Sequence, residues 1–251
     1  MSEERGTVRS AVGMGGITAV SRLVGFVRVL VVARVLGTTH LGDAFQSSNS
    51  VSNVVFELVA AGALSAVLVP AFVDLLDAGD QEGAEEVAGG VLGLAMTGLG
   101  ILALIGVVAA PLIAVALTVG VPDAVAHDQR ALVTFLLRFF IPQVVLYAAG
   151  TVATGVLYAR RRVLPTAAAP IGNTVVMVAA LIAFRVSAGA HPGLRLDATD
   201  RWLLVLAGTG GVVAFVGTLV IACRASGFRL RPRWMPRDRR VTAALRQAGW
   251  G

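Results

Sequence analysis

Five charged side chains interrupt residues 21–70, a stretch otherwise apolar enough to enter a bilayer: Arg22, Arg28, Arg34, Asp43 and Glu57. A charge inside a membrane costs roughly 2.5 to 3.5 kcal/mol on insertion scales, so such residues usually face a partner or a water-filled cavity. A guanidinium group stays charged and donates paired hydrogen bonds to phosphate or carboxylate. The residue types therefore predict a cationic surface at membrane depth that binds an anion, with Arg22 and Arg28 as binding residues.

These arginines also allow a second interpretation. Each of Arg22 and Arg28 would then pair with a carboxylate or with carbonyls at a helix end and only shape the helix bundle. Arg34 lies near the end of its apolar segment, where a long basic side chain reaches the membrane surface, so we expect it to be an interface residue.

Two carboxylates follow in the next apolar segment. Arg22 lies fourteen residues before Leu36 and Glu57 lies fourteen residues after Asp43, which places Arg22 and Glu57 at a similar depth if both segments are helices. We therefore predict that Glu57 is the nearest carboxylate to Arg22 or Arg28. Asp43 is either the N-cap of the second helix or, like Glu57, a gating or ion-coupling carboxylate.

The polar run over residues 46–53 is unusual for a membrane helix. We expect it to face a cavity or neighbouring helices rather than lipid, and we include its last residue, Asn53, among the candidate substrate-binding residues.

The composition indicates an integral membrane protein. Of 251 residues, 56% are hydrophobic and only 14% are charged, whereas soluble domains carry about a quarter charged residues. Six apolar segments approach or exceed the ~20 residues needed to span a bilayer, and they cover residues 11–36, 43–76, 87–119, 131–158, 165–184 and 202–223. The expected fold is an all-α, six-helix transmembrane lobe, with a kink at Pro142 and close packing at the Gly89-x-x-x-Gly93 motif.

The arginines predict the orientation. The triplet at residues 160–162 and the basic segment at residues 224–246 lie on the same side of the six segments, and cytoplasmic loops carry the excess of basic residues. The N-terminus is then cytoplasmic as well. We expect residues 1–225 to form the lobe and residues 226–251 to be a basic cytoplasmic linker leading to a seventh helix beyond the chain.

Other functional classes lack support in the sequence. No G-x-S-x-G, H-E-x-x-H or phosphate-loop motif is present, and the single cysteine and three separated histidines form no metal-ligand pattern. The positive charge, +6, is explained by arginines beside membrane segments. We expect no enzymatic activity, no cofactor, no bound metal and no nucleic-acid partner.

Several motifs resemble the MurJ/MviN lipid II flippases. They are SRLVGFVR at residues 21–28, Gly37, DAF at residues 43–45, Asn53, GALS at residues 62–65 with Val69-Pro70, LLRFFIPQ at residues 136–143, and APIGN at residues 169–173. The resemblance implies the multidrug/oligosaccharidyl-lipid/polysaccharide exporter fold, in which two six-helix lobes enclose a cationic cavity. It places the cavity arginines at Arg22 and Arg28 and the outer aspartate at Asp43.

The resemblance also implies a function. It predicts a transporter of the bacterial inner membrane that moves a polyprenyl-pyrophosphate-linked saccharide, lipid II or a similar cell-wall precursor, from the inner to the outer leaflet by alternating access. The chain would supply one lobe, and its partners would be the lipid-linked saccharide and the missing C-terminal lobe.

Five positions depart from the family pattern: Val29, Ser52, Phe56, Glu57 and Ala61. Because a usual basic pair is replaced by Phe56-Glu57, two alternatives stay open beside lipid II transport. One is a non-transporting membrane scaffold for cell-wall synthesis proteins, and the other is a drug or cation exporter of the same fold.

Overall fold

The computed structural model describes residues 23–57, 70 and 72–235, and all regular secondary structure within them is helical. A helix over residues 23–35 comes first, and a short helical stretch covers residues 72–77. The other elements are α2 His40–Phe56, α4 Gln81–Leu117, α5 Asp123–Phe140, α6 Gln143–Ala159, α7 Val163–Ala188, α8 Ala198–Val205, the π-helical turn η2 Leu206–Gly210 and α9 Gly211–Ala225.

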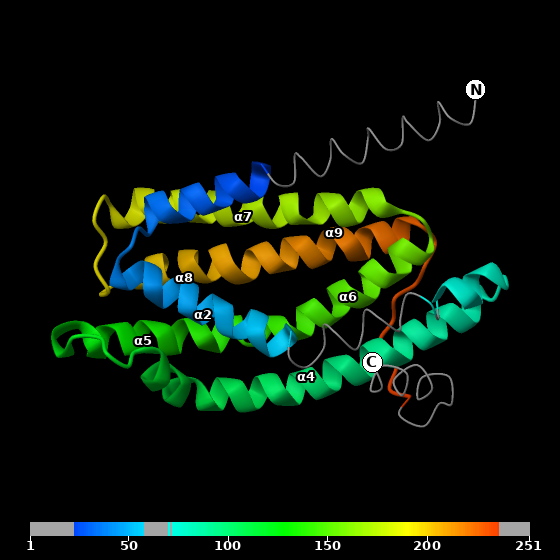
Figure 1. Ribbon diagram of the computed structural model, residues 1–251, viewed down its shortest axis with the longest axis horizontal. Coiled ribbons are helices and arrows are strands. Elements are labelled where there is room, and N and C mark those ends of the chain that lie inside the picture. The colour runs from blue at the N-terminus through cyan, green and yellow to red at the C-terminus, as the bar shows by residue number, and fades with distance from the viewer. Residues whose placement is uncertain (1–22, 58–69, 71, 236–251) are drawn as a thin grey trace.

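Four helical segments of the described chain are long and apolar enough to cross a membrane: Gln81–Leu117, Asp123–Ala159, Val163–Ala188 and Ala198–Ala225. They correspond to the last four predicted spans and extend most of them by several residues. The first two predicted spans lie partly outside the described residues, so the count of six stays a prediction. In Figure 1 the long helices run roughly side by side along the molecule.

The predicted interruption at Pro142 is confirmed. Ile141 and Pro142 form a turn between α5 and α6, because a proline cannot donate the backbone hydrogen bond that would continue a helix. The π-helical turn between α8 and α9 was not predicted. Such turns widen a helix locally and often occur at functional sites.

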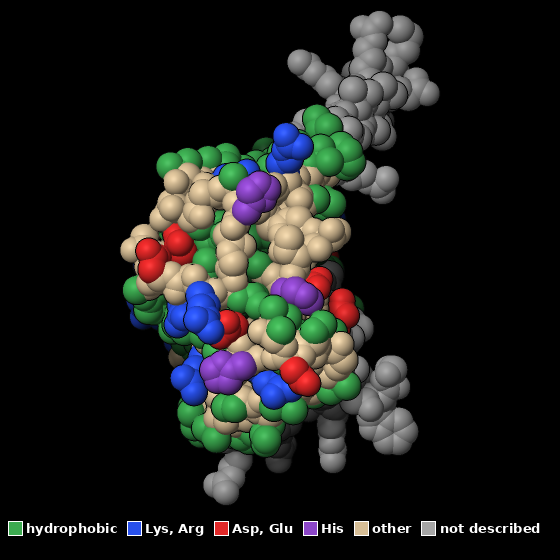
Figure 2. All heavy atoms as spheres, turned by 90° about the vertical axis from the view of Figure 1, so that its left-hand side faces the viewer, with side chains coloured by type: hydrophobic (Ala, Val, Ile, Leu, Met, Phe, Trp, Pro, Cys, Tyr) green, Lys and Arg blue, Asp and Glu red, His purple; other side chains and the backbone are tan. Residues whose placement is uncertain are grey.

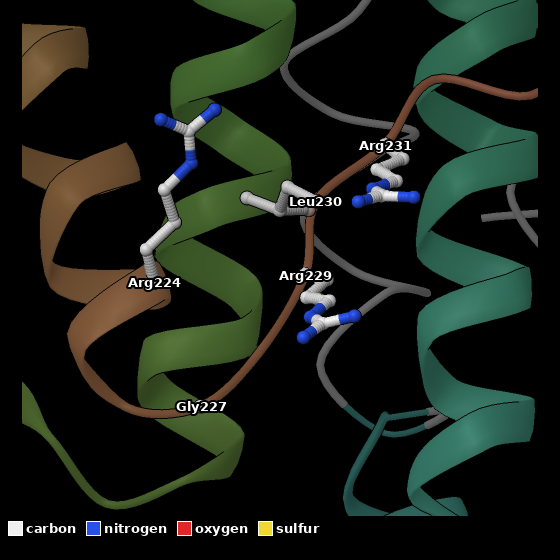
Figure 3. A pocket seen from close by; sticks show the side chains of 5 residues that line it. All are labelled: Arg224, Gly227, Arg229, Leu230 and Arg231. Carbon is white, nitrogen blue, oxygen red and sulfur yellow. The ribbon is translucent and has the colours of Figure 1, made fainter.

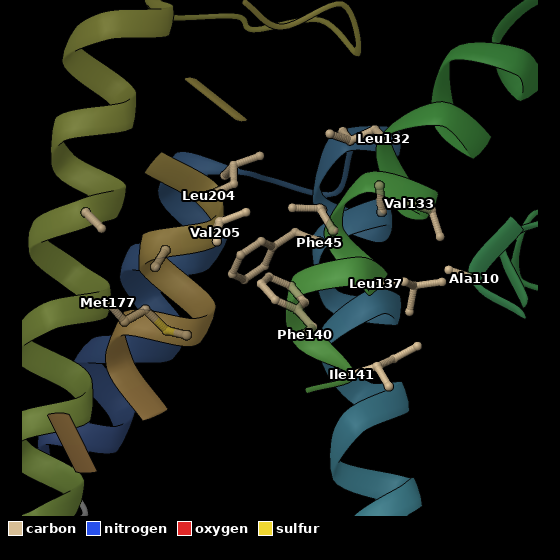
Figure 4. Close-up of a cluster of buried hydrophobic side chains, with 14 of the residues drawn as sticks. Phe45, Ala110, Leu132, Val133, Leu137, Phe140, Ile141, Met177, Leu204 and Val205 are labelled. Atoms are coloured by element: carbon tan, nitrogen blue, oxygen red, sulfur yellow. The ribbon is translucent and has the colours of Figure 1, made fainter. Parts of the chain in front are cut away.

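Two groups of buried side chains hold the bundle together. In the first, drawn in Figure 4, Phe45 of α2 meets Phe140 of α5 edge to face, with ring centroids 5.6 Å apart. The second lies toward the C-terminal end of α9 and includes Phe72, Val156, Leu219 and Phe228. Burying large apolar side chains contributes roughly 1.5–3 kcal/mol each.

The Gly89-x-x-x-Gly93 motif permits close packing, and the described residues that lie against its two glycines, Arg231 and Arg233, are not helical. The segment over residues 228–235 runs along α4 without helical structure, and the N–H of Arg233 donates to the carbonyl of Gly89 at 2.8 Å. A Cβ atom at Gly93 would overlap the carbonyl of Arg233. The described part of the predicted linker is therefore docked on the bundle.

Candidate functional site

Arg28 is the described residue that best meets the prediction of a charge at membrane depth. It lies in the helix over residues 23–35, and its side chain is half-buried. Its guanidinium lies within electrostatic range of Tyr147 on α6. No hydrogen bond or ion pair to another described residue neutralises it, so its charge stays available to a ligand.

Tyr147 connects Arg28 to a network of polar and aromatic side chains. The Tyr147 ring packs against Phe56 of α2 at a centroid distance of 5.3 Å, and its hydroxyl donates to Gln143 Oε1 at 3.5 Å. Gln143, fully buried, donates from Nε2 to Thr209 Oγ1 at 2.8 Å. Thr209 lies in η2 and donates to the carbonyl of Phe139 at 3.2 Å. The network ties α2, α6 and the π-helical turn together.

One face of α2 is polar and exposed along its whole length. We call this face the polar stripe; its residues recur at steps of three and four and are Asp43, Gln46, Ser50, Asn53 and Glu57. Val54 at its edge is also exposed. On the opposite side, Phe45, Ser48 and Ser52 are buried. The polar run thus divides between neighbouring helices and an open face.

The exposed face of α4 has the opposite chemistry. Its large exposed side chains are apolar, among them Ile101, Leu104, Ile105, Val108, Leu112 and Val115. A surface of this kind suits lipid, whereas carboxylate and amide side chains exposed to lipid would be strongly unfavourable. The exposed face of α4 is therefore compatible with lipid, whereas the polar stripe of α2 is compatible with water.

Asp43 is not the N-cap of α2. The N-cap is Thr39, whose Oγ1 accepts from the N–H of Gly42 at 3.2 Å. Asp43 lies in the first turn with its side chain exposed. The negative charge of Asp43 interacts favourably with the positive end of the helix dipole. Its carboxylate, however, accepts no capping hydrogen bond. Of the two predicted roles for Asp43, the structural one as N-cap is wrong.

Glu57 makes no ion pair with Arg28 among the described residues. It forms the C-cap of α2 and is exposed at the end of the polar stripe. Arg22 lies outside the described residues, so the prediction that Glu57 is the nearest carboxylate to either arginine stays a prediction. Asn53 lies one turn before Glu57 and is exposed on the same face.

The side-chain oxygen of Asn173 in α7 is buried and has no hydrogen-bond partner in the described chain. It lies against Gly211 of α9, where a Cβ atom would overlap it. Gly211 therefore lets the two helices approach closely at η2.

The end of the bundle where α2 begins carries a second group of cations. Arg34 and Arg185, with His191, line a pocket of about 360 Å³. Beside it, Arg195 bridges to Asp128 at 2.8 Å, and this carboxylate holds the pKa of Arg195 above its usual value. Figure 2 shows basic, acidic and histidine side chains together on this end. Arg34 is exposed there, in agreement with an interface role.

Sequence reasoning missed Tyr147, Gln143 and Thr209. Gln143 is fully buried within an apolar segment, and a buried amide in such a segment needs a partner. The sequence could therefore have indicated that Gln143 has a polar partner. It could not identify that partner as Thr209, which lies 66 residues further along the chain. In the described residues no group of His, Cys, Asp or Glu side chains could hold a metal ion.

The long apolar helices, the lipid-compatible face of α4 and the polar stripe define an α-helical, multi-pass membrane protein. The chain belongs to the lipid II flippase MurJ family, whose model matches residues 32–251. Flippases are transporters, so the family agrees with the expectation that the chain is not an enzyme.

Individual relatives carry the same family description. The chain is 27% identical over 237 residues to the "Probable lipid II flippase MurJ" of Rhizobium tropici, and the match covers 93% of this chain and 43% of that protein. With the Rhizobium meliloti protein it is 28% identical over 238 residues, with the same coverage. The "Lipid II flippase MurJ" of Burkholderia cenocepacia is 25% identical over 175 residues, covering 69% of this chain and 33% of that protein. The chain thus spans less than half the length of these relatives.

Proposed function

We propose that the chain is the N-terminal six-helix lobe of a two-lobe transporter in the bacterial inner membrane. The complete protein would move a polyprenyl-pyrophosphate-linked saccharide, lipid II or a close relative, from the inner to the outer leaflet by alternating access. The proposal is supported by the relatives, which are described as lipid II flippases.

The polar stripe is the observation that carries this proposal. Every third or fourth residue from Asp43 to Glu57 is polar and exposed, while α4 exposes apolar side chains. A water-filled cavity against α2 accounts for both surfaces, because exposed polar side chains at membrane depth require water or a partner. A lipid whose headgroup is a pyrophosphate and sugars needs such a wet passage.

The candidate residues divide into two roles. Arg22 and Arg28 would bind the pyrophosphate, because guanidinium groups keep their charge and donate paired hydrogen bonds to its oxygens. Asn53 would contribute an amide to the same ligand. The exposed carboxylates of Asp43 and Glu57 would respond to an ion or to the approaching lobe and so couple or gate the transition. No covalent step is required.

Orientation and completeness belong to the same proposal. The basic residues at 160–162 and 224–233 support a cytoplasmic N-terminus. A lobe that spans 43% of a relative provides one wall of a cavity, and a C-terminal lobe would provide the other. Cell-wall synthesis proteins are the further partners we propose.

The test is Arg28→Ala in the complete protein, with translocation of a fluorescent lipid II followed in proteoliposomes. We expect at least about a tenfold loss of rate, because an arginine–phosphate contact contributes roughly 1.5–3 kcal/mol. Arg138→Ala is the matched control, since Arg138 is an exposed arginine in the last turn of α5 and its side chain makes no hydrogen bond or ion pair with the described residues.

Transport that is equal in the Arg28 and Arg138 variants would contradict the proposed role of Arg28. The scaffold alternative makes a different prediction. If the protein is a scaffold, the Arg28→Ala variant should still support growth of a strain depleted of the wild-type protein, even where the variant does not translocate lipid II. Efflux of an organic cation that survives Arg28→Ala would instead favour the exporter alternative.

A further inference from the structure

A further cationic site, distinct from Arg28 and from the cations around Arg34, lies where α9 ends. This is the opposite end of the bundle from Arg34. The chain turns back after α9 and encloses a pocket of about 520 Å³ with α9. We call it the basic pocket; its lining residues, drawn in Figure 3, are Arg224, Gly227, Arg229, Leu230 and Arg231. Among the lining residues that the structure describes, three are arginines and none is acidic.

The backbone of this pocket is held by contacts to two helices, α4 and α6. Arg160, at the end of α6, donates to the carbonyl of Ser226 and to Gln81 Oε1. Gln81 of α4 donates to the carbonyl of Gly227 at 3.0 Å. The N–H of Arg229 donates to Glu85 Oε1 at 3.1 Å. These hydrogen bonds hold the turn against α4 and α6.

Apolar contacts fix the same segment. Phe228 is fully buried, and the Arg160 guanidinium lies 5.4 Å from the centroid of its ring. Leu230 is also buried. Two buried anchors alternate with exposed Arg229 and Arg231, so the anchoring directs the arginine side chains outward.

The charges of the basic pocket are not neutralised within the described chain. The nearby carboxylates are engaged elsewhere, since Glu85 accepts from Gln81 and from the Arg229 backbone, and Glu86 pairs with Arg233 at 3.3 Å. No described ion pair or hydrogen bond involves the side chain of Arg224, Arg229 or Arg231. Three unpaired guanidinium groups in one pocket favour binding of an anion with several oxygens.

The surroundings point to phosphate at a membrane surface. Arg224 ends an apolar helix that exposes Ile221, and Trp234 is exposed further along the segment. Tryptophan and arginine are both enriched where a membrane helix meets water, and basic pockets at that level bind phosphorylated headgroups. We propose that the basic pocket binds a phosphate group, carried either by an anionic phospholipid or by a soluble phosphate compound.

This site is separate from the transport site proposed above. It lies beyond the end of α9, whereas the polar stripe belongs to α2 and Arg28 acts near Tyr147 on α6. Binding at the basic pocket does not require translocation, and it can be tested whether or not the flippase function holds.

The experiment measures binding to the purified full chain in detergent. Native mass spectrometry follows titration with phosphatidylglycerol and, separately, with phosphatidylcholine, and calorimetry follows titration with inorganic phosphate. We compare the wild type with the double variant Arg229→Gln/Arg231→Gln. Its matched control is Arg161→Gln/Arg162→Gln, which removes the same charge from two exposed arginines at the same end of the bundle.

We expect the pocket variant to bind at least about tenfold more weakly than the wild type and the control variant to bind as the wild type does. Arginine-dependent retention of phosphatidylglycerol over phosphatidylcholine identifies a lipid headgroup, and arginine-dependent binding of inorganic phosphate without lipid preference identifies a soluble source. Equal losses in both variants, or no binding that depends on Arg229 and Arg231, would overturn the proposal. Circular dichroism verifies that the variants are folded.

Discussion

Arg28 shows how one residue is given a role by its neighbours. Its half-buried guanidinium lies within range of Tyr147, and Phe56 packs on the same ring. Phe56 is one of the positions at which we expect a departure from the family's basic pair, and in the structure it supplies an aromatic contact to Tyr147. Arg28 is the described cation that acts on Tyr147, so we expect anion binding beside this ring to depend on Arg28.

Gly93 is a residue whose importance comes from the space it leaves open. We predict that Gly93→Ala releases the segment over residues 228–235, because a Cβ atom would overlap the Arg233 carbonyl. Overpacking of this kind costs typically about 1–3 kcal/mol. Limited trypsin digestion measures the release as faster cleavage after Arg229 and Arg233, and thermal unfolding in detergent measures the destabilisation.

Gly98→Ala is the control on the same helix, since a Cβ atom at Gly98 meets nothing within 4 Å. It should leave cleavage unchanged and stabilise α4 slightly, as glycine is unfavourable in helices. Identical digestion of the Gly93 and Gly98 variants would mean that the segment does not depend on the close approach at Gly93.

At the scale of elements, α2 and α4 differ in the chemistry of their exposed faces. The polar stripe follows one side of α2, and a continuous apolar face follows α4. The bundle also contains two irregular places, the turn at Pro142 and the π-helical turn at η2. Gln143 and Thr209 join these two irregular places by a 2.8 Å hydrogen bond.

We predict that Thr209→Val destabilises the protein by about 1–3 kcal/mol, because the buried amide of Gln143 loses the partner that its Nε2 needs. Thermal unfolding in detergent measures the change. The control is Thr218→Val, whose hydroxyl bonds only to Ala214 within its own helix at 2.8 Å. If the two variants unfold at the same temperature, the hydrogen bond between Gln143 and Thr209 does not stabilise the contact between α6 and η2.

At the scale of the whole molecule, the two ends of the bundle carry different cationic sites. One end has Arg34, Arg185 and His191 around a pocket, and the other has the arginine-rich turn after α6 and the basic pocket after α9. The second end has the greater density of arginine, which is the basis for proposing that it faces the cytoplasm.

Cysteine labelling tests this orientation in the complete protein. We expect Ala190→Cys to react with a membrane-impermeant thiol reagent from outside the inner membrane, and Arg162→Cys to react only from the cytoplasmic side, because both positions are exposed at opposite ends. The native Cys223 is fully buried, and labelling of the protein without either substitution measures the background. The reverse labelling pattern would contradict the proposed orientation.

Hydropathy predicted four helical segments that the structure describes, and Pro142 predicted the break between α5 and α6. Both predictions depend on local properties, namely the apolar content of twenty residues and the missing N–H of proline. The N-cap of α2 was not predicted correctly because Thr39 and Asp43 are both suitable cap residues, and the choice depends on where the preceding turn closes. The glycine motif was identified, but its partner is a segment about 140 residues away.

The sequence by itself determined that the protein is a helical membrane protein, because the hydropathy and the length of a helix depend only on residues that are close together in the chain. It also showed that the charged residues within apolar segments gather before and along α2. The tertiary structure decided which of those residues are exposed and that Arg28 lies near Tyr147. It also decided that Arg224, in the last turn of α9, shares a pocket with Arg229 and Arg231. These arrangements depend on packing between segments far apart in the chain, where each side chain's surroundings are set by its neighbours in space.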